Sequence, residues 1–150
     1  MHFSTRTPFC FRQSKPVSDC IGDSVIVSIG IDIIEVQRIR ETVGRSPRFV
    51  ERVFTDRERQ YCESRGIAAA QHYAARFAAK EAVLKALQTG WSGGIAWRDI
   101  EVSSKESGAP FITLSGVALE LFEELGATTI HLSISHTTDH AIAQVILEKA

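Results

Sequence analysis

Residues 68–87 form the segment that most restricts how this chain can fold. The segment contains neither glycine nor proline and is rich in alanine and larger apolar residues, so it predicts one long α-helix. At about 100° per residue, Phe77, Val83 and Leu87 fall on one arc of this helix, and alanines occupy the opposite side. A helix that is apolar on all sides is buried, and we therefore expect it at the centre of the fold.

Three charged residues, Lys80, Glu81 and Lys85, interrupt the C-terminal half of this apolar helix, residues 77–87. Lys80 falls in the middle of the arc and Glu81 at its edge, where an unpaired charge is costly to bury. In one interpretation, Glu81 and Lys85 form an ordinary helix pair at positions i and i+4, worth about 0.2–0.5 kcal/mol, and Lys80 extends its stem to water. In the other interpretation, the charges belong to a functional site. The helix alone does not decide between the two.

The first ordered element is predicted at residues 25–34, whose richness in valine and isoleucine indicates a β-strand. Side chains alternate along a strand, which puts the following residues on one face: Val25, Val27, Ile29, Ile31 and Ile33. The other face carries Asp32 beside Ser28 and Gly30, and these small neighbours predict open space next to the carboxylate. Asp32 and Glu35 also have the D-x-x-E spacing of a helix N-cap with a reciprocal acid.

The remaining pattern predicts an α+β domain with an antiparallel sheet packed on the long central helix. Helices are expected near residues 35–43, 47–54, 55–65 and 116–126, and strands at 95–104, 109–115 and 129–147, the last range folding as a hairpin. Thr55 followed by Glu58 is a capping-box start for the third of these helices.

Composition excludes several classes of protein. A chain of 150 residues most simply makes one domain, and its formal net charge of -1 excludes a globally basic surface for nucleic acid, so any basic patch must be local. No apolar run approaches the roughly 20 residues of a membrane span. The cysteines Cys10, Cys20 and Cys62 lack metal-type spacing and indicate free thiols in a reducing compartment. We therefore expect a cytoplasmic protein with neither nucleic acid nor membrane as partner.

Residues 1–24 differ from the rest of the chain. They contain Pro8 and Pro16, have no acidic residue before Asp19, and show no helical or strand period. We expect a disordered leader, with the folded domain at residues 25–150. A transit peptide and translation from an upstream start codon are the alternatives.

Two carboxylates on separate elements, Asp32 and Glu81, could hold a hard divalent cation. Mg²⁺ typically takes one or two carboxylates, keeps several waters and binds substrate phosphates. The nearby cations Arg76, Lys80 and Lys85 would suit a phosphate ligand. This combination favours phosphoryl-type transfer, although the spacing alone is a weak signal.

The histidine-rich C-terminal region allows two other interpretations. His131 and His136 are five residues apart on a predicted strand and therefore lie on opposite faces, so a zinc site that also uses His140 is improbable. Ser135, His136 and Asp139 resemble a hydrolase triad in composition only, because neighbours in sequence rarely converge and no G-x-S-x-G motif is present. His136 is then either a strand-end residue that faces the hairpin turn or a phosphate contact.

Three motifs, in this order, resemble those of the holo-[acyl-carrier-protein] synthases, which are small phosphopantetheinyl transferases. They are GIDIIEVQRI (residues 30–39), RFAAKEAVLKAL (76–87) and LSISHTTDHAIAQVIL (132–147), and FTDRE and WRDIEV also match. The resemblance covers residues 25–147, and the combination is far more specific than any single motif. Residues 1–24 are extra relative to the family pattern.

The resemblance implies an enzyme that moves 4′-phosphopantetheine from coenzyme A to a serine of apo acyl carrier protein. The by-product would be adenosine 3′,5′-bisphosphate, Mg²⁺ would be required, and the reaction would support fatty acid biosynthesis. The family is typically homotrimeric, with coenzyme A bound between adjacent subunits. A non-catalytic module that binds the carrier and a metal-dependent phosphohydrolase acting on nucleotides are the alternatives.

The resemblance also assigns roles to residues of this chain. Asp32 and Glu81 would bind Mg²⁺, Glu81 would act as the base for the carrier serine, and Lys85 would stabilise or protonate the leaving phosphate. Coenzyme A phosphates would be bound by Arg76, Lys80 and His136. The acidic helix of the carrier would dock on a basic helix with Arg38, Arg45, Arg48 and Arg52.

Overall fold

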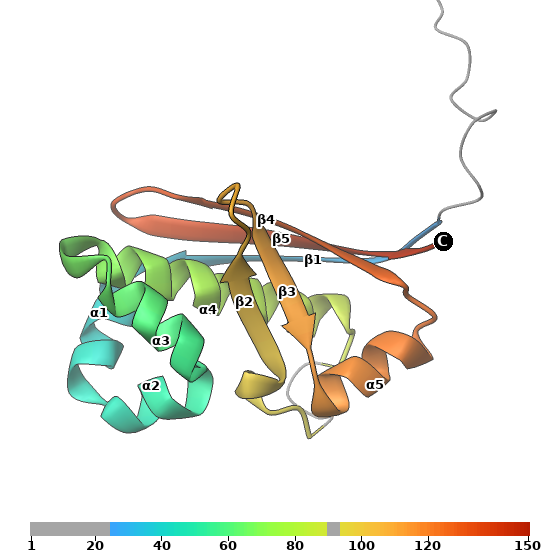
Figure 1. Cartoon of the computed structure of the whole chain (residues 1–150), viewed down its shortest axis with the longest axis horizontal. Coiled ribbons are helices and arrows are strands. Elements are labelled where there is room, and N and C mark those ends of the chain that lie inside the picture. Colours follow the sequence, from blue (N-terminus) through green and yellow to red (C-terminus); the bar gives the residue numbers. More distant parts are fainter. Residues whose placement is uncertain (1–24, 90–93) are drawn as a thin grey trace, which may run out of the picture.

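The computed structural model describes residues 25–89 and 94–150, and in these ranges it confirms the predicted α+β architecture (Figure 1). The elements are β1 (Val25–Glu35), α1 (Val36–Arg45), α2 (Pro47–Val53), α3 (Asp56–Glu63), η2 (Gly66–Ala68), α4 (Ala69–Ala86), η3 (Trp97–Asp99), β2 (Ile100–Ser104), β3 (Pro110–Leu114), α5 (Gly116–Glu124), β4 (Thr129–His136) and β5 (His140–Lys149). The predicted leader, with Cys10 and Cys20, lies outside the described residues.

The core is formed where α4 packs on one face of a three-stranded antiparallel sheet with strand order β1-β5-β4 (Figure 1). Every second residue of the central strand β5 is buried, namely Ala141, Ala143, Val145 and Leu147. Helix α4 is buried on several sides, as predicted, because β2 and the helices α1 and α3 cover the parts that the sheet leaves open. The hairpin β2–β3 forms a separate two-stranded sheet.

Gly30 of β1 marks the closest approach between the sheet and α4. A Cβ atom built at Gly30 would lie 1.9 Å from the carbonyl oxygen of Ala82, so only glycine fits there. The predicted open space next to Asp32 is therefore wrong at Gly30, because the backbone of α4 fills that position. The predicted N-cap is wrong as well: Asp32 stays within β1, and α1 begins after Glu35 without a side-chain cap.

The Gly30→Ala variant should lose about 1–3 kcal/mol of stability, because overpacking displaces α4 from the sheet. Urea unfolding measures this loss as a lower midpoint. Gly44→Ala is the matched control, because nothing lies within 4 Å of its added Cβ. In the helix α1 that change should be neutral or stabilising. Equal midpoints for the Gly30→Ala variant and the wild type would contradict the close approach.

The other face of the sheet carries exposed apolar side chains. Ile29 and Ile31 are each 52% exposed and Ile33 is 61% exposed, while Ile142 of β5 pairs with Ile33 and is 37% exposed. Ile29, Ile31 and Ile33 of the apolar row predicted for β1 thus face away from α4 in a single chain, whereas Val27, at a shift in the strand register, packs against the core. We call Ile29, Ile31, Ile33 and Ile142 the isoleucine face.

Most of the remaining predicted elements are present. Thr55 and Glu58 form the expected capping box at α3, and α5 is followed by Gly126 with a φ of 72°. No helix in the described ranges is long and apolar enough to cross a membrane.

Candidate functional site

Asp32 and Lys85 form an ion pair between β1 and α4. The Lys85 Nζ atom lies 2.7 Å from Asp32 Oδ1 and also donates to the backbone carbonyl of Ile31 at 2.9 Å. The partner of Lys85 is therefore Asp32 on the neighbouring strand β1. The interpretation as an ordinary helix pair required Glu81 as the partner, and the structure does not show that pair. Lys85 is half exposed, with 52% of its side chain accessible, so the ammonium group can also reach a ligand.

Glu81 lies half-buried close to Asp32. Burial raises the pKa of the Glu81 carboxyl, and the charge of Asp32 raises it further, while Lys85 and Arg38 act in the opposite direction. Two carboxylates that repel each other in this way are stabilised by a cation between them. Asp32 and Glu81, the two residues of the predicted metal site, therefore lie close enough for their charges to interact.

The second oxygen of Asp32, Oδ2, is buried and has no hydrogen-bond partner among the described residues. A buried acceptor without a partner costs about 1–3 kcal/mol, so an oxygen-seeking cation would fit here. Within the described ranges no group of three or more His, Cys, Asp or Glu side chains could hold a metal. Residues 25–89 and 94–150 therefore offer at most a two-carboxylate site, the kind of protein contribution that is typical for Mg²⁺.

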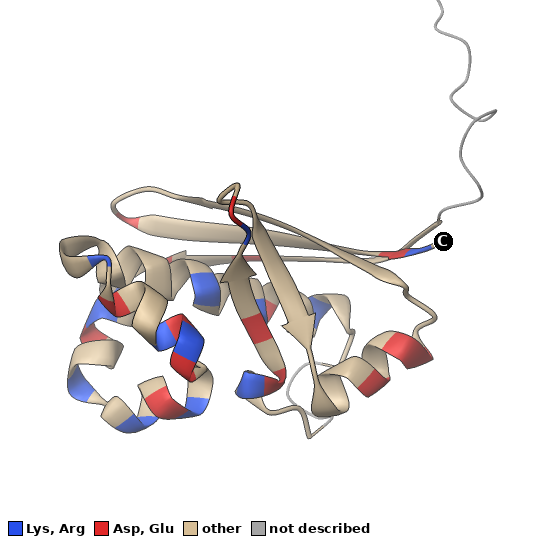
Figure 2. Ribbon diagram, viewed as in Figure 1, with Lys and Arg blue, Asp and Glu red and all other residues tan. Residues whose placement is uncertain are grey.

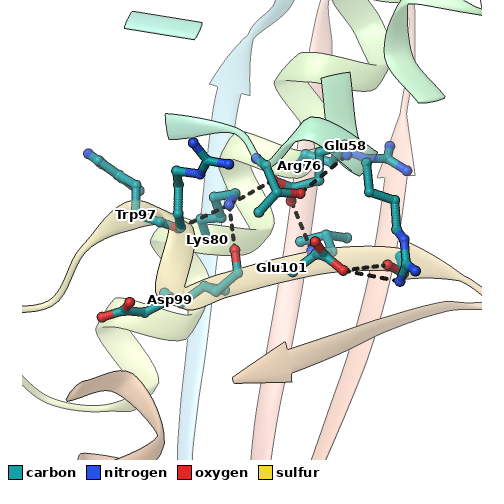
Figure 3. A network of polar contacts seen from close by, with 12 residues as sticks. Glu58, Arg76, Lys80, Trp97, Asp99 and Glu101 are labelled. Atoms are coloured by element: carbon teal, nitrogen blue, oxygen red, sulfur yellow. Dashed lines mark hydrogen bonds and ion pairs between the residues drawn. The ribbon is translucent and has the colours of Figure 1, made fainter. Parts of the chain in front are cut away.

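Lys80 does not belong to this cluster. It is 0% exposed, and its Nζ atom lies 2.9 Å from Glu58 Oε2 in α3 and 3.0 Å from the carbonyl oxygen of Trp97, with a further bond to the carbonyl of Ile100 (Figure 3). All of these partners are internal to the fold. The expected contact between Lys80 and coenzyme A phosphates is not available in this arrangement, and we leave Lys80 out of the candidate site.

Arg76 is a buried arginine whose side chain lines a cavity. The residue is only 4% exposed, its guanidinium group stacks 3.9 Å from the ring centroid of Tyr61, and its Nε atom has no partner among the described residues. Arg76 lines a cavity of about 160 Å³ together with His72 and His136. The structure therefore brings Arg76 and His136, two of the predicted phosphate contacts, to one cavity, which we call the inner cavity.

His72 and Tyr61 are residues of this cavity that the motifs did not indicate. The ring of His72 lies 5.4 Å from that of His136 and 5.5 Å from that of Tyr61, both in edge-to-face geometry. Burial lowers the pKa of His72, and His136, Arg76 and Arg65 lower it further. The one available signal was spacing, because His72 and Arg76 are four residues apart and share a face of α4.

The two clusters do not meet within one chain. Asp32 is aligned with Ala143 and His136 with Ala141, so the two side chains stand on outer strands that flank β5. Two strand spacings amount to about 10 Å, and α4 covers the central strand between them. Asp32 and Glu81 are accordingly not among the residues that line the inner cavity.

The four predicted docking arginines, Arg38, Arg45, Arg48 and Arg52, are all exposed on α1 and α2. Figure 2 marks Lys and Arg positions along the ribbon of these helices, with some acidic positions between them, at one end of the molecule, and Asp and Glu positions on α5 at the other. A local basic surface therefore exists in a chain whose formal net charge is -1.

Comparisons of sequence and of structure with known proteins both find similarity to one family of enzymes. Residues 28–145 match the family model of the 4′-phosphopantetheinyl transferase superfamily. The chain is 48% identical to the holo-[acyl-carrier-protein] synthase of Trichlorobacter lovleyi over 83% of its length and 98% of that protein. It is 45% identical to the enzyme of the same name from Koribacter versatilis, over 83% of its length and 99% of that protein.

A solved structure extends the likeness to the fold. The holo-(acyl-carrier-protein) synthase of Bacillus anthracis, determined in complex with CoA (3′,5′-ADP), is 39% identical, with a TM-score of 0.69. The alignment covers 83% of this chain and 98% of that one.

Proposed function

We propose, on the premise that the chain belongs to the 4′-phosphopantetheinyl transferase superfamily, that it is a holo-[acyl-carrier-protein] synthase. It transfers 4′-phosphopantetheine from coenzyme A to a serine of apo acyl carrier protein. The observation that carries this proposal is the pairing of Asp32 with Glu81 and Lys85, in which one buried Asp32 oxygen has no protein partner.

Asp32 and Glu81 are the residues that would hold Mg²⁺. The ion would neutralise charge on the pyrophosphate of coenzyme A. A carboxylate with a raised pKa is a better proton acceptor near neutral pH, which supports Glu81 as the base for the carrier serine.

In the proposed reaction, the serine oxygen bonds to the phosphorus next to the pantetheine, and the bond from that phosphorus to the bridging oxygen breaks. The serine proton goes to Glu81, and adenosine 3′,5′-bisphosphate leaves. Lys85, which bonds to Asp32 and to the Ile31 carbonyl, would donate to the leaving phosphate.

A homotrimer would resolve the separation between the carboxylate cluster and the inner cavity. The carboxylates of one subunit could lie beside the phosphate-binding cavity of the next, and the exposed isoleucine face offers an apolar surface for the contact. We therefore propose that the enzyme assembles through this face and that coenzyme A binds between subunits.

Ile31→Glu should convert the assembly to monomers, because a charge cannot be buried unpaired in an apolar contact. Sedimentation velocity measures the change, and turnover should fall with it. Ile67→Glu is the matched control: Ile67 is 99% exposed on η2, far from the isoleucine face in the chain, and should leave the assembly intact. An unchanged sedimentation coefficient for the Ile31→Glu variant would rule out this face as the contact.

The acidic helix of the carrier protein would dock on the arginines of α1 and α2. Arg45→Glu should raise the KM for the carrier on the order of tenfold, equivalent to about 1.4 kcal/mol, and the effect should weaken as salt is added. Lys149→Glu, on β5, makes the same charge change away from these helices and should leave the KM unchanged. A KM for the Arg45→Glu variant equal to that of wild type at low salt would remove this arginine from the docking surface.

Cytoplasmic location stays a prediction from the cysteine pattern. Cys62 is buried and free, and burial raises the pKa of its thiol to about 12. The thiol is thereby kept protonated and unreactive.

A further inference from the structure

The inner cavity contains two histidines and one arginine but, among its described lining residues, no carboxylate. His72 and Arg76 lie four residues apart on α4, and His136 ends β4. The Arg76 side chain is buried and stacks on Tyr61, and its Nε atom has no partner among the described residues. The cavity therefore favours an anion, and under the proposed function that anion is a phosphate of coenzyme A.

His72 is a half-buried residue of this cavity that packs against two other aromatic rings. Its ring centroid lies 5.5 Å from that of Tyr61 and 5.4 Å from that of His136. Among the described residues, His131 is the one histidine whose ring nitrogen forms a hydrogen bond or an ion pair, and its partner is Glu148. The ring nitrogens of His72 and His136 are therefore available to a ligand.

The groups that face His72 disfavour a positive charge on its ring in the free protein. Burial lowers the pKa of His72, and the basic groups of His136, Arg76 and Arg65 lower it further. On the opposite side, the hairpin β2–β3 contributes Val102, Ser104, Gly108 and Pro110 to the lining, none of which carries a charge. His72 of the free protein is therefore neutral at pH 7.

We propose, on the basis of the proposed function, that His72 takes up a proton from water when a phosphate of coenzyme A enters the inner cavity, so that the affinity for coenzyme A falls as the pH rises. The negative charge of the phosphate offsets the basic groups that keep the imidazole neutral in the free protein. The protonated ring then has two N–H donors, one of which can bond to a phosphate oxygen. His72 thereby becomes a proton-linked binding residue beside Arg76 and His136.

This linkage has a defined direction. Because the pKa of His72 is lower in the free protein than in the proposed complex, binding takes up a proton at any pH between the two values. The added affinity is complete below the pKa of the free protein, and it is lost as the pH rises through the pKa of the complex. A difference of one unit between the two values changes the affinity about tenfold.

Proton NMR of the imidazole rings tests the proposal in the whole protein. The His72 signal, identified by its loss in the His72→Gln variant, should titrate with a midpoint below about 6.5 in the free protein. Saturating coenzyme A should raise this midpoint by about one pH unit or more. Pantetheine, which has no phosphate, is the matched ligand and should leave the midpoint unchanged. A midpoint that stays in place or falls when coenzyme A is bound would overturn the proposal.

Calorimetry then separates His72 from the titration of coenzyme A itself. The 3′-phosphate of coenzyme A also titrates near about pH 6, so the wild type is compared at each pH with His72→Gln and with His72→Phe, which keeps an aromatic ring against Tyr61. The affinity advantage of the wild type over both variants should shrink about tenfold between pH 5.5 and pH 8.

Thermal unfolding checks the fold of both variants, and the wild-type NMR titration stands without them because through-bond assignment also identifies the His72 signal. Parallel pH profiles of the wild type and the two variants would overturn the role of His72 while leaving the transferase function intact. Failure of the wild type to bind coenzyme A at any pH would instead overturn the proposed function itself.

Discussion

Replacing Asp32 with asparagine should lower turnover by about a thousandfold, or roughly 4 kcal/mol of transition-state stabilisation, while the protein stays folded. The variant keeps the shape of the side chain but removes the charge that pairs with Lys85 and the buried oxygen that has no other partner. The proposed cation site and the ion pair that positions Lys85 are lost together. Glu81→Gln should have an effect of similar size, because it removes the second carboxylate and the proposed base.

The measurement is the initial rate of holo-carrier formation at saturating coenzyme A, with thermal unfolding as the check on folding. Glu124→Gln is the matched control. Glu124 is an exposed carboxylate at the end of α5, an element that does not carry the site, and its loss should leave turnover unchanged. Near wild-type turnover in either Asp32→Asn or Glu81→Gln would show that the paired carboxylates are not the catalytic centre.

Replacing Lys80 with methionine should lower the free energy of unfolding by about 3–5 kcal/mol, because it leaves Glu58 charged and uncompensated in the core. Both side chains are 0% exposed and lie 2.9 Å apart. Glu58 also accepts hydrogen bonds from the backbone N–H groups of Thr55 and Val102, each at 2.8 Å, so it ties α3 to β2 as well as to α4 (Figure 3).

Urea unfolding of the folded variant measures the loss, and a second substitution separates charge from packing. Adding Glu58→Gln to Lys80→Met removes the isolated charge and keeps an acceptor for one of the two backbone donors, because the amide has one oxygen where the carboxylate has two. The double variant should recover part of the lost stability. If Lys80→Met alone has the wild-type unfolding free energy, the pair is not a structural element, and the original assignment of Lys80 to phosphate binding returns.

Much of the architecture could be predicted from local patterns. Three features depend only on residues close in sequence. They are the alanine-rich segment that forms α4, the capping box of Thr55 and Glu58, and the closing hairpin. The faces of β1 could not be predicted in this way. The alternation of side chains along a strand predicts which residues share a face. Which of the two faces is buried depends on the packing of α4 against Gly30. The isoleucine face remains open in one chain, where alternation alone indicates a core.

The site shows the same division between local and long-range information. Asp32 and Glu81 were expected together, and the structure places them so, because each belongs to a motif on an element of regular geometry. Lys80 was misplaced because its position on the helix gives a direction but not a partner. Glu58, which neutralises it, comes from another helix 22 positions earlier in the chain. Tyr61 likewise joins the inner cavity only through tertiary packing.

The mass of the carrier protein after reaction is the direct test of whether this enzyme transfers phosphopantetheine to it. Apo acyl carrier protein, coenzyme A and Mg²⁺ are incubated with the enzyme, and the intact carrier is weighed by mass spectrometry. We expect a gain of one phosphopantetheine group on the carrier, together with release of adenosine 3′,5′-bisphosphate, and about a thousandfold slower gain when the enzyme carries Asp32→Asn. A carrier of unchanged mass, or release of the bisphosphate without any carrier present, would contradict the proposed transfer.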